Sequence, residues 1–330
     1  MKRKIFLIVA VVLMVSLIFG LAGCGQKEEP KKEGEAKNYK IALVLPGPIN
    51  DQGWNATAYA GLQLVKKDLG IDMEYIENVQ QADFEATLRD YGEKGYDLVF
   101  AHGVQFTDAV NKVAPQYPKT FFMVINSDQG KAPNIGGIGI REWEGGYVAG
   151  TIAALTTKTK KLGAIGSFPF PVIKGTIDAF EMAAKAVDPS IKVMKTYVNS
   201  WEDIQKGKET ALAMAESGAD VLFCTANQVG LGSIEAAKTK GVKAIGYIAP
   251  QNDVAPGTVV ASVLYKTPNL FKWVVEQFVA GKLEPKGYSQ GWAEGVLEMD
   301  WTNDVPQDVK DKVNAVIEDL KAGKIEAPKP

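Results

Sequence analysis

The chain contains one pattern of predicted elements twice, and this repeat constrains its fold more than any single motif. Residues 41–78 and 162–199 each read as an apolar strand, a loop rich in glycine and proline, an amphipathic helix and a second strand. In the first helix Trp54, Ala58 and Leu62 recur at helical spacing on one face. Strands that alternate with such helices are typical of parallel α/β sheets. Two copies therefore predict two similar, doubly wound lobes.

The rest of each half extends this pattern. Further helices are predicted at residues 82–93 and 204–216, and further strands at 97–100, 121–125, 220–223 and 243–247. After the turn at 255–257 we expect a strand (258–264), a helix (269–279), a strand (295–299) and a helix (306–322). These last elements are expected to be shared between the lobes, which gives a hinge with several crossovers. The expected first lobe is 39–152 plus about 260–286, and the second is 153–259 plus about 287–330.

The N-terminus is expected to direct export. Three basic residues precede the almost entirely apolar run 5–21, so residues 1–23 resemble a secretory signal peptide. The sequence Leu-Ala-Gly before Cys24 resembles a bacterial lipobox, in which the cysteine is lipidated; a plain membrane anchor with an incidental cysteine is the alternative. Residues 24–38 have the charged composition of a flexible tether. We therefore expect an extracytoplasmic protein that is anchored to the cell membrane through lipid on Cys24.

Composition argues against several classes of protein. Lys and Arg number 37 against 39 Asp and Glu, so no basic patch for nucleic acid is expected. With Cys24 lipidated, Cys224 has no cysteine partner, and His102 is the only histidine, a weak basis for a metal site or a catalytic triad. No dinucleotide-binding glycine motif follows the first strand, and we expect no phosphate-binding loop or nucleophile elbow. We expect a monomer without catalytic residues, cofactor or metal.

The candidate ligand contacts lie in loops that follow strands. In open parallel sheets, ligands bind beyond the C-terminal ends of the strands. The loops that meet this condition are 47–54, 102–106, 126–129, 167–174, 225–230 and 248–253. The candidates in them are mainly aromatic residues and neutral amides: Trp54, Phe106, Phe168, Phe170, Asn50, Asp51, Asn55, Gln105, Asn126, Asn227, Gln228 and Gln251. Aromatic faces stack on rings and amides pair with polar ring edges, which predicts a flat, polar, uncharged small-molecule ligand; a sugar would also fit.

Some of these residues have a structural alternative. Trp54 also lies on the apolar face of its helix, and Asp51 is placed to cap that helix. Asn126 follows a buried strand directly and could satisfy local backbone groups. We expect one of Phe168 and Phe170 to face the cleft.

Several motifs resemble the basic membrane protein (BMP) family of ABC-transporter substrate-binding lipoproteins, which includes purine nucleoside receptors. They are 51–55 (DQGWN), 124–126 (VIN), 144–150 (EGGYVAG), 230–237 (GLGSIEAA) and 255–257 (APG). The resemblance implies a type I periplasmic-binding-protein fold, no catalysis, and a ligand cleft that closes between hinged lobes. It also implies delivery of the ligand to an ABC permease and ATPase. Trp54 stands where the family has a base-stacking aromatic, and Asn126 stands where an acid often meets the base.

The sequence departs from the nucleoside receptors on the ribose side. Residues 246–251 (GYIAPQ) lack two acids, Tyr265 replaces a lysine, and Asn227 stands near the place of the second stacking aromatic. These differences favour a free purine-type nucleobase or a related heterocycle. The alternatives are a purine nucleoside and a sugar or signal molecule read by a sensor. More distant alternatives are an extracellular enzyme and a surface adhesin without a cleft ligand.

Overall fold

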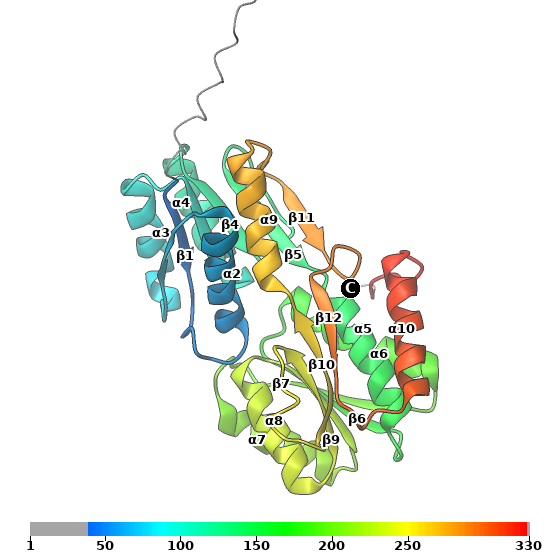
Figure 1. Cartoon of the computed structure of the whole chain (residues 1–330). Helices are drawn as coiled ribbons and strands as arrows, with labels where there is room; N and C mark the ends of the chain where they lie inside the picture. Colours follow the sequence, from blue (N-terminus) through cyan, green and yellow to red (C-terminus); the bar gives the residue numbers. More distant parts are fainter. Residues whose placement is uncertain (1–38, 329–330) are drawn as a thin grey trace, which may run out of the picture. The chain divides into compact units, whose positions relative to one another are not determined.

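Two six-stranded sheets organise residues 39–328, which are the residues described in this computed structural model (Figure 1). The predicted signal peptide and tether, with Cys24, lie outside the described residues. The first sheet has the order β11-β5-β4-β3-β1-β2, and all its neighbouring strands are parallel. Its strands are β1 (Ile41–Val44), β2 (Met73–Ile76), β3 (Leu98–His102), β4 (Phe121–Ile125), β5 (Ile135–Ile140) and β11 (Gly287–Gln290).

The second sheet has the order β12-β10-β9-β8-β6-β7. Only the edge strand β12 is antiparallel to its neighbour. The strands are β6 (Lys161–Gly166), β7 (Lys192–Tyr197), β8 (Val221–Thr225), β9 (Lys243–Ile248), β10 (Val259–Tyr265) and β12 (Leu297–Trp301). Both sheets therefore share the doubly wound order second-first-third-fourth-fifth, which confirms the two repeated α/β lobes.

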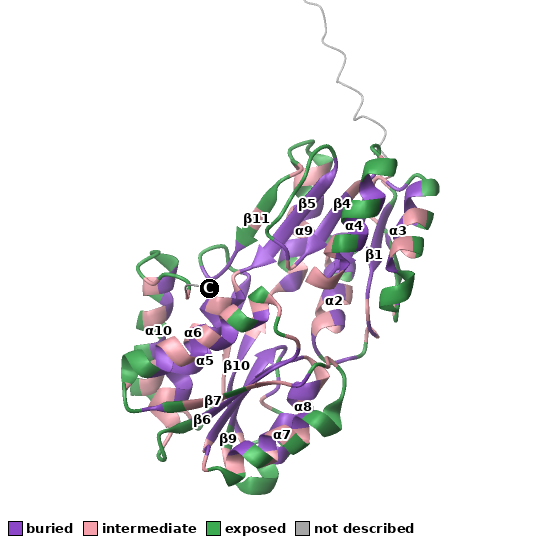
Figure 2. Cartoon of the chain, turned by 180° about the vertical axis from the view of Figure 1, so that it is seen from behind, coloured by how far each residue is buried: buried purple, intermediate pink, exposed green. Residues whose placement is uncertain are grey.

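Helices cover the faces of both sheets. The helices are α2 (Trp54–Leu69), α3 (Phe84–Glu93), α4 (Thr107–Val113), α5 (Glu142–Thr156), α6 (Pro171–Val187), α7 (Ile204–Glu216), α8 (Gln228–Lys240), α9 (Thr267–Val279) and α10 (Gln307–Lys321). Short 3₁₀ turns occupy Gln81–Asp83, Val104–Phe106 and Ala114–Gln116. Helix α2 packs on α9, α3 on α4, α5 on α6, and α7 on α8. Figure 2 shows buried residues concentrated along the strands and exposed residues on the outer sides of the helices.

The predicted helical faces pack as expected, except at one end of each helix. Ala58, Leu62 and Val65 of α2 are buried in the core, whereas Trp54 at its first position is only half-buried. In α6, Ile177 and Phe180 are buried, but Val187 is exposed because it is the last residue of the helix. The apolar periodicity therefore identified the core face but not its end.

The chain crosses between the sheets after β5, after β10 and after β11. These crossings place the lobe boundaries differently from the sequence-based expectation. Strand β10, expected in the first lobe from about residue 260, pairs with β9 and β12 in the second sheet. Strand β11, expected in the second lobe from about 287, pairs with β5 in the first. Helix α5 packs on α6, so the first crossing lies near residue 141 and not 152.

Within the described residues, we find no helix with the length and apolar character needed to cross a membrane.

Candidate ligand-binding cleft

Three adjoining cavities lie where strands of both sheets end. Their volumes are about 620, 260 and 30 Å³. Gln105, which follows β3, lines all three. The smallest cavity shares Asn126 and Glu142 with the largest, and Trp54 and Asn227 with the middle one, so together they form one cleft. Residues from both lobes line it, as expected for loops at the switch points of doubly wound sheets.

Tryptophans from different lobes line the same part of the cleft. Trp54 begins α2 in the first lobe, and Trp201 lies in the loop after β7 in the second; both line the middle and smallest cavities. On the second lobe, the ring of Trp201 lies 5.6 Å from that of Phe168 and 6.4 Å from that of Phe170. These three rings form an aromatic wall of the cleft, in which Trp201 lines both of these cavities, Phe168 the middle one and Phe170 the largest one.

The ring of His102 stacks on one face of the Trp54 indole. Their ring centroids lie 4.1 Å apart at an interplanar angle of 16°, and His102 Nε2 donates a hydrogen bond of 3.0 Å to the Trp54 carbonyl oxygen. Burial lowers the pKa of His102 to about 4, so the ring is neutral at physiological pH. The stack occupies one face of the Trp54 indole, and a ligand ring can therefore stack only on the other face.

Asp51 holds the start of α2. Its carboxylate accepts hydrogen bonds from the backbone N–H groups of Gly53, Asn55 and Ala56 and from Asn55 Nδ2, at 2.8–2.9 Å. This arrangement satisfies N–H groups that have no partner within the helix, which confirms the capping role considered from the sequence. Asp51 is buried and does not line the three cavities.

Asn227 joins the two lobes at the same helix terminus. From the second lobe, its Oδ1 accepts the N–H of Trp54 at 3.1 Å, and its Nδ2 donates to Asp51 Oδ2 at 3.0 Å. A Cβ atom on Gly53 would lie 2.3 Å from Asn227 Oδ1, so this approach requires glycine at position 53. Asn227 therefore caps α2 from the opposite lobe.

A buried carboxyl group also lines the cleft. Glu142, the first residue of α5, lines the largest and smallest cavities, and its Oε1 accepts a hydrogen bond of 2.7 Å from Asn126 Nδ2. Burial raises the pKa of Glu142 to about 7, and the hydrogen bond from Asn126 opposes this rise. The Asn126 Oδ1 atom is buried and has no hydrogen-bond partner among the described residues.

The cleft contains seven of the twelve predicted contacts. The residues that line it are Trp54, Asn55, Gln105, Asn126, Phe168, Phe170 and Asn227. Their contact with a ligand stays a prediction. Both Phe168 and Phe170 line the cleft, whereas one was expected.

The other predicted contacts lie elsewhere. Phe106 is wrong as a cleft residue: the 3₁₀ turn after β3 directs it into the core, where it is fully buried and stacks on Phe84 at 3.7 Å. Gln251 is buried and its Oε1 accepts the N–H of Tyr247 at 3.0 Å, so it serves the loop after β9. Asn50 is exposed and Gln228 is half-buried, and neither lines these cavities.

The cleft residues that sequence reasoning missed include Trp201, Glu202 and Glu142. Trp201 and Glu202 follow β7, the second strand of the second repeat. The rule that ligands bind beyond strand ends applies to this strand as well and could have found them. Glu142 follows β5, a strand that the sequence did not predict, so no comparable signal was present.

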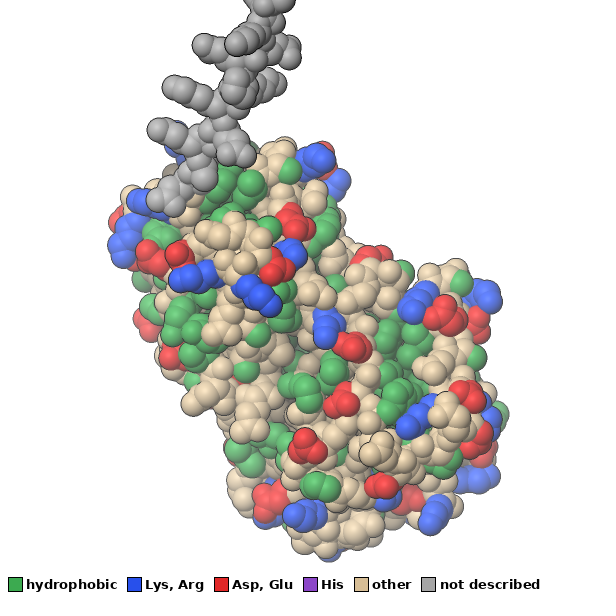
Figure 3. All heavy atoms as spheres, in the orientation of Figure 1, with side chains coloured by type: hydrophobic (Ala, Val, Ile, Leu, Met, Phe, Trp, Pro, Cys, Tyr) green, Lys and Arg blue, Asp and Glu red, His purple; other side chains and the backbone are tan. Residues whose placement is uncertain are grey.

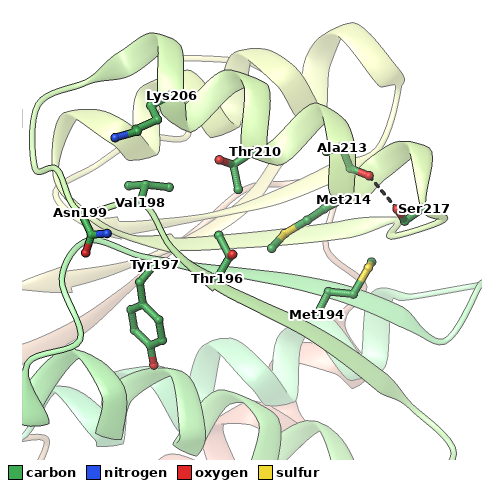
Figure 4. Close-up of a pocket in the computed structure, with 10 residues that line it drawn as sticks. All are labelled: Met194, Thr196, Tyr197, Val198, Asn199, Lys206, Thr210, Ala213, Met214 and Ser217. Atoms are coloured by element: carbon green, nitrogen blue, oxygen red, sulfur yellow. Dashed lines mark hydrogen bonds between the residues drawn. The ribbon is translucent and has the colours of Figure 1, made fainter.

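Two other features do not form a second site. A hollow of about 500 Å³ between β7 and α7 (Figure 4) is lined by Met194, Thr196, Met214 and neighbours, on one lobe only and without a predicted contact.

Residues 287–291 have the spacing Gly-x-Ser-x-Gly, contrary to expectation, but residues 287–290 form β11 and no helix follows them directly. They therefore do not form a nucleophile elbow. The described residues contain no group of acidic, His or Cys side chains placed to hold a metal.

Charges of both signs are interspersed on the surface shown in Figure 3. This distribution agrees with the nearly balanced composition of the chain.

The chain is similar to known proteins along most of its length. Residues 38–329 match the family described as Bmp, ABC transporter substrate-binding protein PnrA-like. The ABC transporter nucleoside-binding protein BmpA of Lactococcus lactis is 32% identical over 244 residues, 72% of this chain and 69% of that protein. The transcriptional activator protein med of Bacillus subtilis is 29% identical over 294 residues, 89% of this chain and 90% of that protein. The crystal structure of solute-binding proteins of an Aeropyrum pernix ABC transporter system matches with TM-score 0.79 and 20% identity, over 88% of this chain and 94% of that one. The last likeness confirms the predicted type I periplasmic-binding-protein fold.

Proposed function

Because this chain belongs to the Bmp family of ABC-transporter substrate-binding proteins, we propose that its cleft captures a flat polar heterocycle of the purine-nucleobase type. The family consists of solute-binding proteins and not of enzymes, and such proteins act outside the cytoplasm. The ligand is then presented to the permease and ATPase subunits of an importer.

One observation carries the proposal: Trp54 and Trp201, on different lobes, line the same two cavities together with the amides of Gln105 and Asn227. Two indoles supply faces for a flat ring, and the amides supply donors and acceptors for its edge. Trp201 supplies a second aromatic that the sequence comparison did not locate. Because the tryptophans belong to different lobes, a ring that contacts both favours the closed arrangement.

The residue that stands in place of the ribose-binding lysine favours a base over a nucleoside. Tyr265 stands where the resemblance leads one to expect a lysine, and its hydroxyl donates a hydrogen bond of 2.7 Å to the hydroxyl of Tyr247. Both tyrosines are buried. The tyrosine pair therefore places uncharged hydroxyl groups at the position where nucleoside receptors carry a charged partner for the ribose.

A purine nucleoside is the second candidate, because the largest cavity adjoins the tryptophans. Asp108, Ser127 and Asp128 line this cavity of about 620 Å³, and their oxygens are suitable partners for sugar hydroxyls. The relative BmpA is named a nucleoside-binding protein. The name of the relative med refers to transcription, but the net charge of −2 gives this chain no electrostatic basis for binding DNA.

We also propose that the chain is anchored through lipid on Cys24 and acts as a monomer. The support for the anchor is the apolar run and the Leu-Ala-Gly-Cys sequence at its end. Replacement of Cys24 by Ser should move the protein from the membrane fraction to the soluble extracytoplasmic fraction or leave it unprocessed. An unchanged membrane fraction with a processed N-terminus would contradict lipid anchoring.

The ligand proposal is tested by replacing Trp201 with Ala and measuring the binding of adenine, guanine and hypoxanthine by titration calorimetry. Stacking on an aromatic contributes about 1–3 kcal/mol per base, so the dissociation constant should rise about 5- to 150-fold. The matched control is Trp273→Ala, because Trp273 packs on Tyr288 and does not line the cleft. Equal losses of affinity in both variants would contradict the stacking role of Trp201.

A further inference from the structure

We propose that Glu142 is a positioning residue that fixes the amide of Asn126, so that the site selects heterocycles whose polar edge carries an N–H donor. The inference rests on the proposed function, since it concerns the ligand of the same cleft. It assigns the recognition of the polar edge to a pair of residues that line both the largest and the smallest cavity.

Asn126 is held in place by its backbone. It follows β4 with φ +66°, a left-handed conformation that asparagine tolerates better than most residues, and its N–H donates to Ile138 O at 2.8 Å. Because both the turn and the backbone bond are fixed, the side-chain amide can reach only a small set of partners. The partner that it meets is the carboxyl group of Glu142, at 2.7 Å.

The ionised form of Glu142 dictates the direction of that amide. A carboxylate only accepts hydrogen bonds, so Asn126 must turn its NH₂ group toward Glu142. The amide oxygen is then the atom left for another partner, and Asn126 Oδ1 has none among the described residues. Since Asn126 borders both the largest and the smallest cavity, a ligand N–H is a suitable donor for this oxygen.

The groups that face Glu142 from neighbouring elements are uncharged. Asn126 faces it from the end of β4, Thr176 from α6, and Tyr265 from β10. From β9, Tyr247 donates its hydroxyl to the backbone oxygen of Glu142 at 3.0 Å. The adjacent Arg141 is engaged by carboxylates other than that of Glu142: its Nε and Nη2 atoms lie 2.5 Å from Glu144 and Glu294, respectively. Across the largest cavity the acidic residues are Asp108 and Asp128.

Glu142 therefore changes its charge near neutral pH. Its burial raises its pKa to about 7. Above pH 7 the carboxylate holds the amide with its oxygen available to the ligand. Below pH 7 the protonated carboxyl can donate to Asn126 Oδ1, which removes the acceptor from the ligand. His102 does not contribute in this range because its pKa is lowered to about 4.

The test is titration calorimetry of the full chain with hypoxanthine, adenine and guanine, and with 1-methylhypoxanthine, at pH 6 and pH 8. We expect bases with an N–H edge to bind on the order of 10-fold more tightly at pH 8, since two pH units span the titration of Glu142. A methylated edge should bind on the order of 10- to 100-fold more weakly at pH 8, because it leaves the buried oxygen unpaired. These comparisons need no variant and so do not depend on the folding of one.

Variants then separate the residues. Glu142→Gln should abolish the dependence on pH, because its amide has no charge to lose. Asn126→Gly keeps the positive φ but removes the amide, and should abolish discrimination between hypoxanthine and its methyl derivative. Glu209→Gln is the matched control, because Glu209 is an exposed carboxylate on α7 that lines none of the three cavities, and it should keep the pH dependence of the wild type.

The outcomes distinguish this assignment from the proposed function. Tight binding of a base with the same affinity at pH 6 and pH 8, in the wild type and in Glu142→Gln, would overturn the role of Glu142 only. Absence of binding by every base would overturn the proposed function and this assignment with it.

Discussion

The replacement Asn227→Gly should open the unliganded protein. It removes the side chain that joins the lobes but keeps a residue that tolerates the φ of +48° found there. The lost hydrogen bonds are one of 3.1 Å to the N–H of Trp54 and one of 3.0 Å to the carboxylate of Asp51. Asp51 keeps its bonds to the start of α2, so the helix terminus remains capped from its own lobe.

The size of the effect follows from these two bonds. A neutral hydrogen bond contributes about 0.5–1.5 kcal/mol and one to a charged group about 1.5–3 kcal/mol. Asp51 retains other donors, so we expect the lower half of the combined range, about 2–3 kcal/mol. This corresponds to a decrease of about 30- to 150-fold in the ratio of closed to open protein.

Small-angle X-ray scattering without ligand measures this change as an increase in the radius of gyration. Asn199→Gly is the matched control: Asn199 also has a positive φ, of +55°, and lines the middle cavity, but it lies outside the Asp51–Asn227 contact. We expect the control to keep the wild-type radius. A folded Asn227→Gly protein with an unchanged radius of gyration would refute the proposal that the Asn227 side chain holds the two lobes together.

Further predictions concern stability. Arg141→Ala leaves the buried Glu144 without its cation and should lower the unfolding free energy by about 3–5 kcal/mol in urea denaturation, whereas no change would contradict a stabilising role of this ion pair. Burial lowers the pKa of His102 to about 4, so below about pH 6.5 the unfolded chain binds a proton that the folded chain does not bind. As pH falls from 6.5 to 4, the free energy of unfolding of the wild type should therefore decrease by up to about 3 kcal/mol relative to that of His102→Gln. Parallel stability curves for these two proteins would contradict the burial of a neutral ring. Gly150→Ala should lower the unfolding free energy by about 1–3 kcal/mol because its Cβ would lie 2.1 Å from the carbonyl oxygen of Phe180, while Gly175→Ala in α6 meets open space and should leave stability unchanged or raise it by up to about 1 kcal/mol.

The sequence was sufficient for elements whose apolar pattern is regular. The helix predicted at residues 204–216 and the strand predicted at 121–125 have those bounds in the structure. Their side chains repeat with the period of the element, so burial of one face identifies them. The repeat also predicted two similar lobes, and the two sheets have the same strand order.

Elements rich in glycine were not predicted. Strand β5 has the sequence Ile-Gly-Gly-Ile-Gly-Ile, and α5 contains Gly146 and Gly150 within its first ten residues. A Cβ on Gly146 would lie 2.2 Å from the carbonyl oxygen of Thr176, so both glycines allow α6 to pack closely on α5. Such glycines serve contacts with other elements, and propensity assigns them to loops.

The candidate site was predictable in position but not in detail. The rule for parallel sheets located the loops that carry Trp54, Gln105 and Asn126. It could not separate Phe106 from these residues, because the 3₁₀ turn that buries Phe106 is a local rotation without a sequence signal. Nor could it find Glu142, whose place depends on a crossing between lobes.

The central claim is that the cleft binds a free purine-type base between Trp54 and Trp201. Its most direct test is a thermal-shift measurement on the full chain with purine and pyrimidine bases, their nucleosides and common sugars, each at about 100 times the expected dissociation constant. A ligand at that ratio adds about 2.7 kcal/mol of stability. We predict a clear rise in melting temperature with purine bases and little or none with nucleosides and sugars. A rise with nucleosides or sugars, and none with the bases, would contradict the claim.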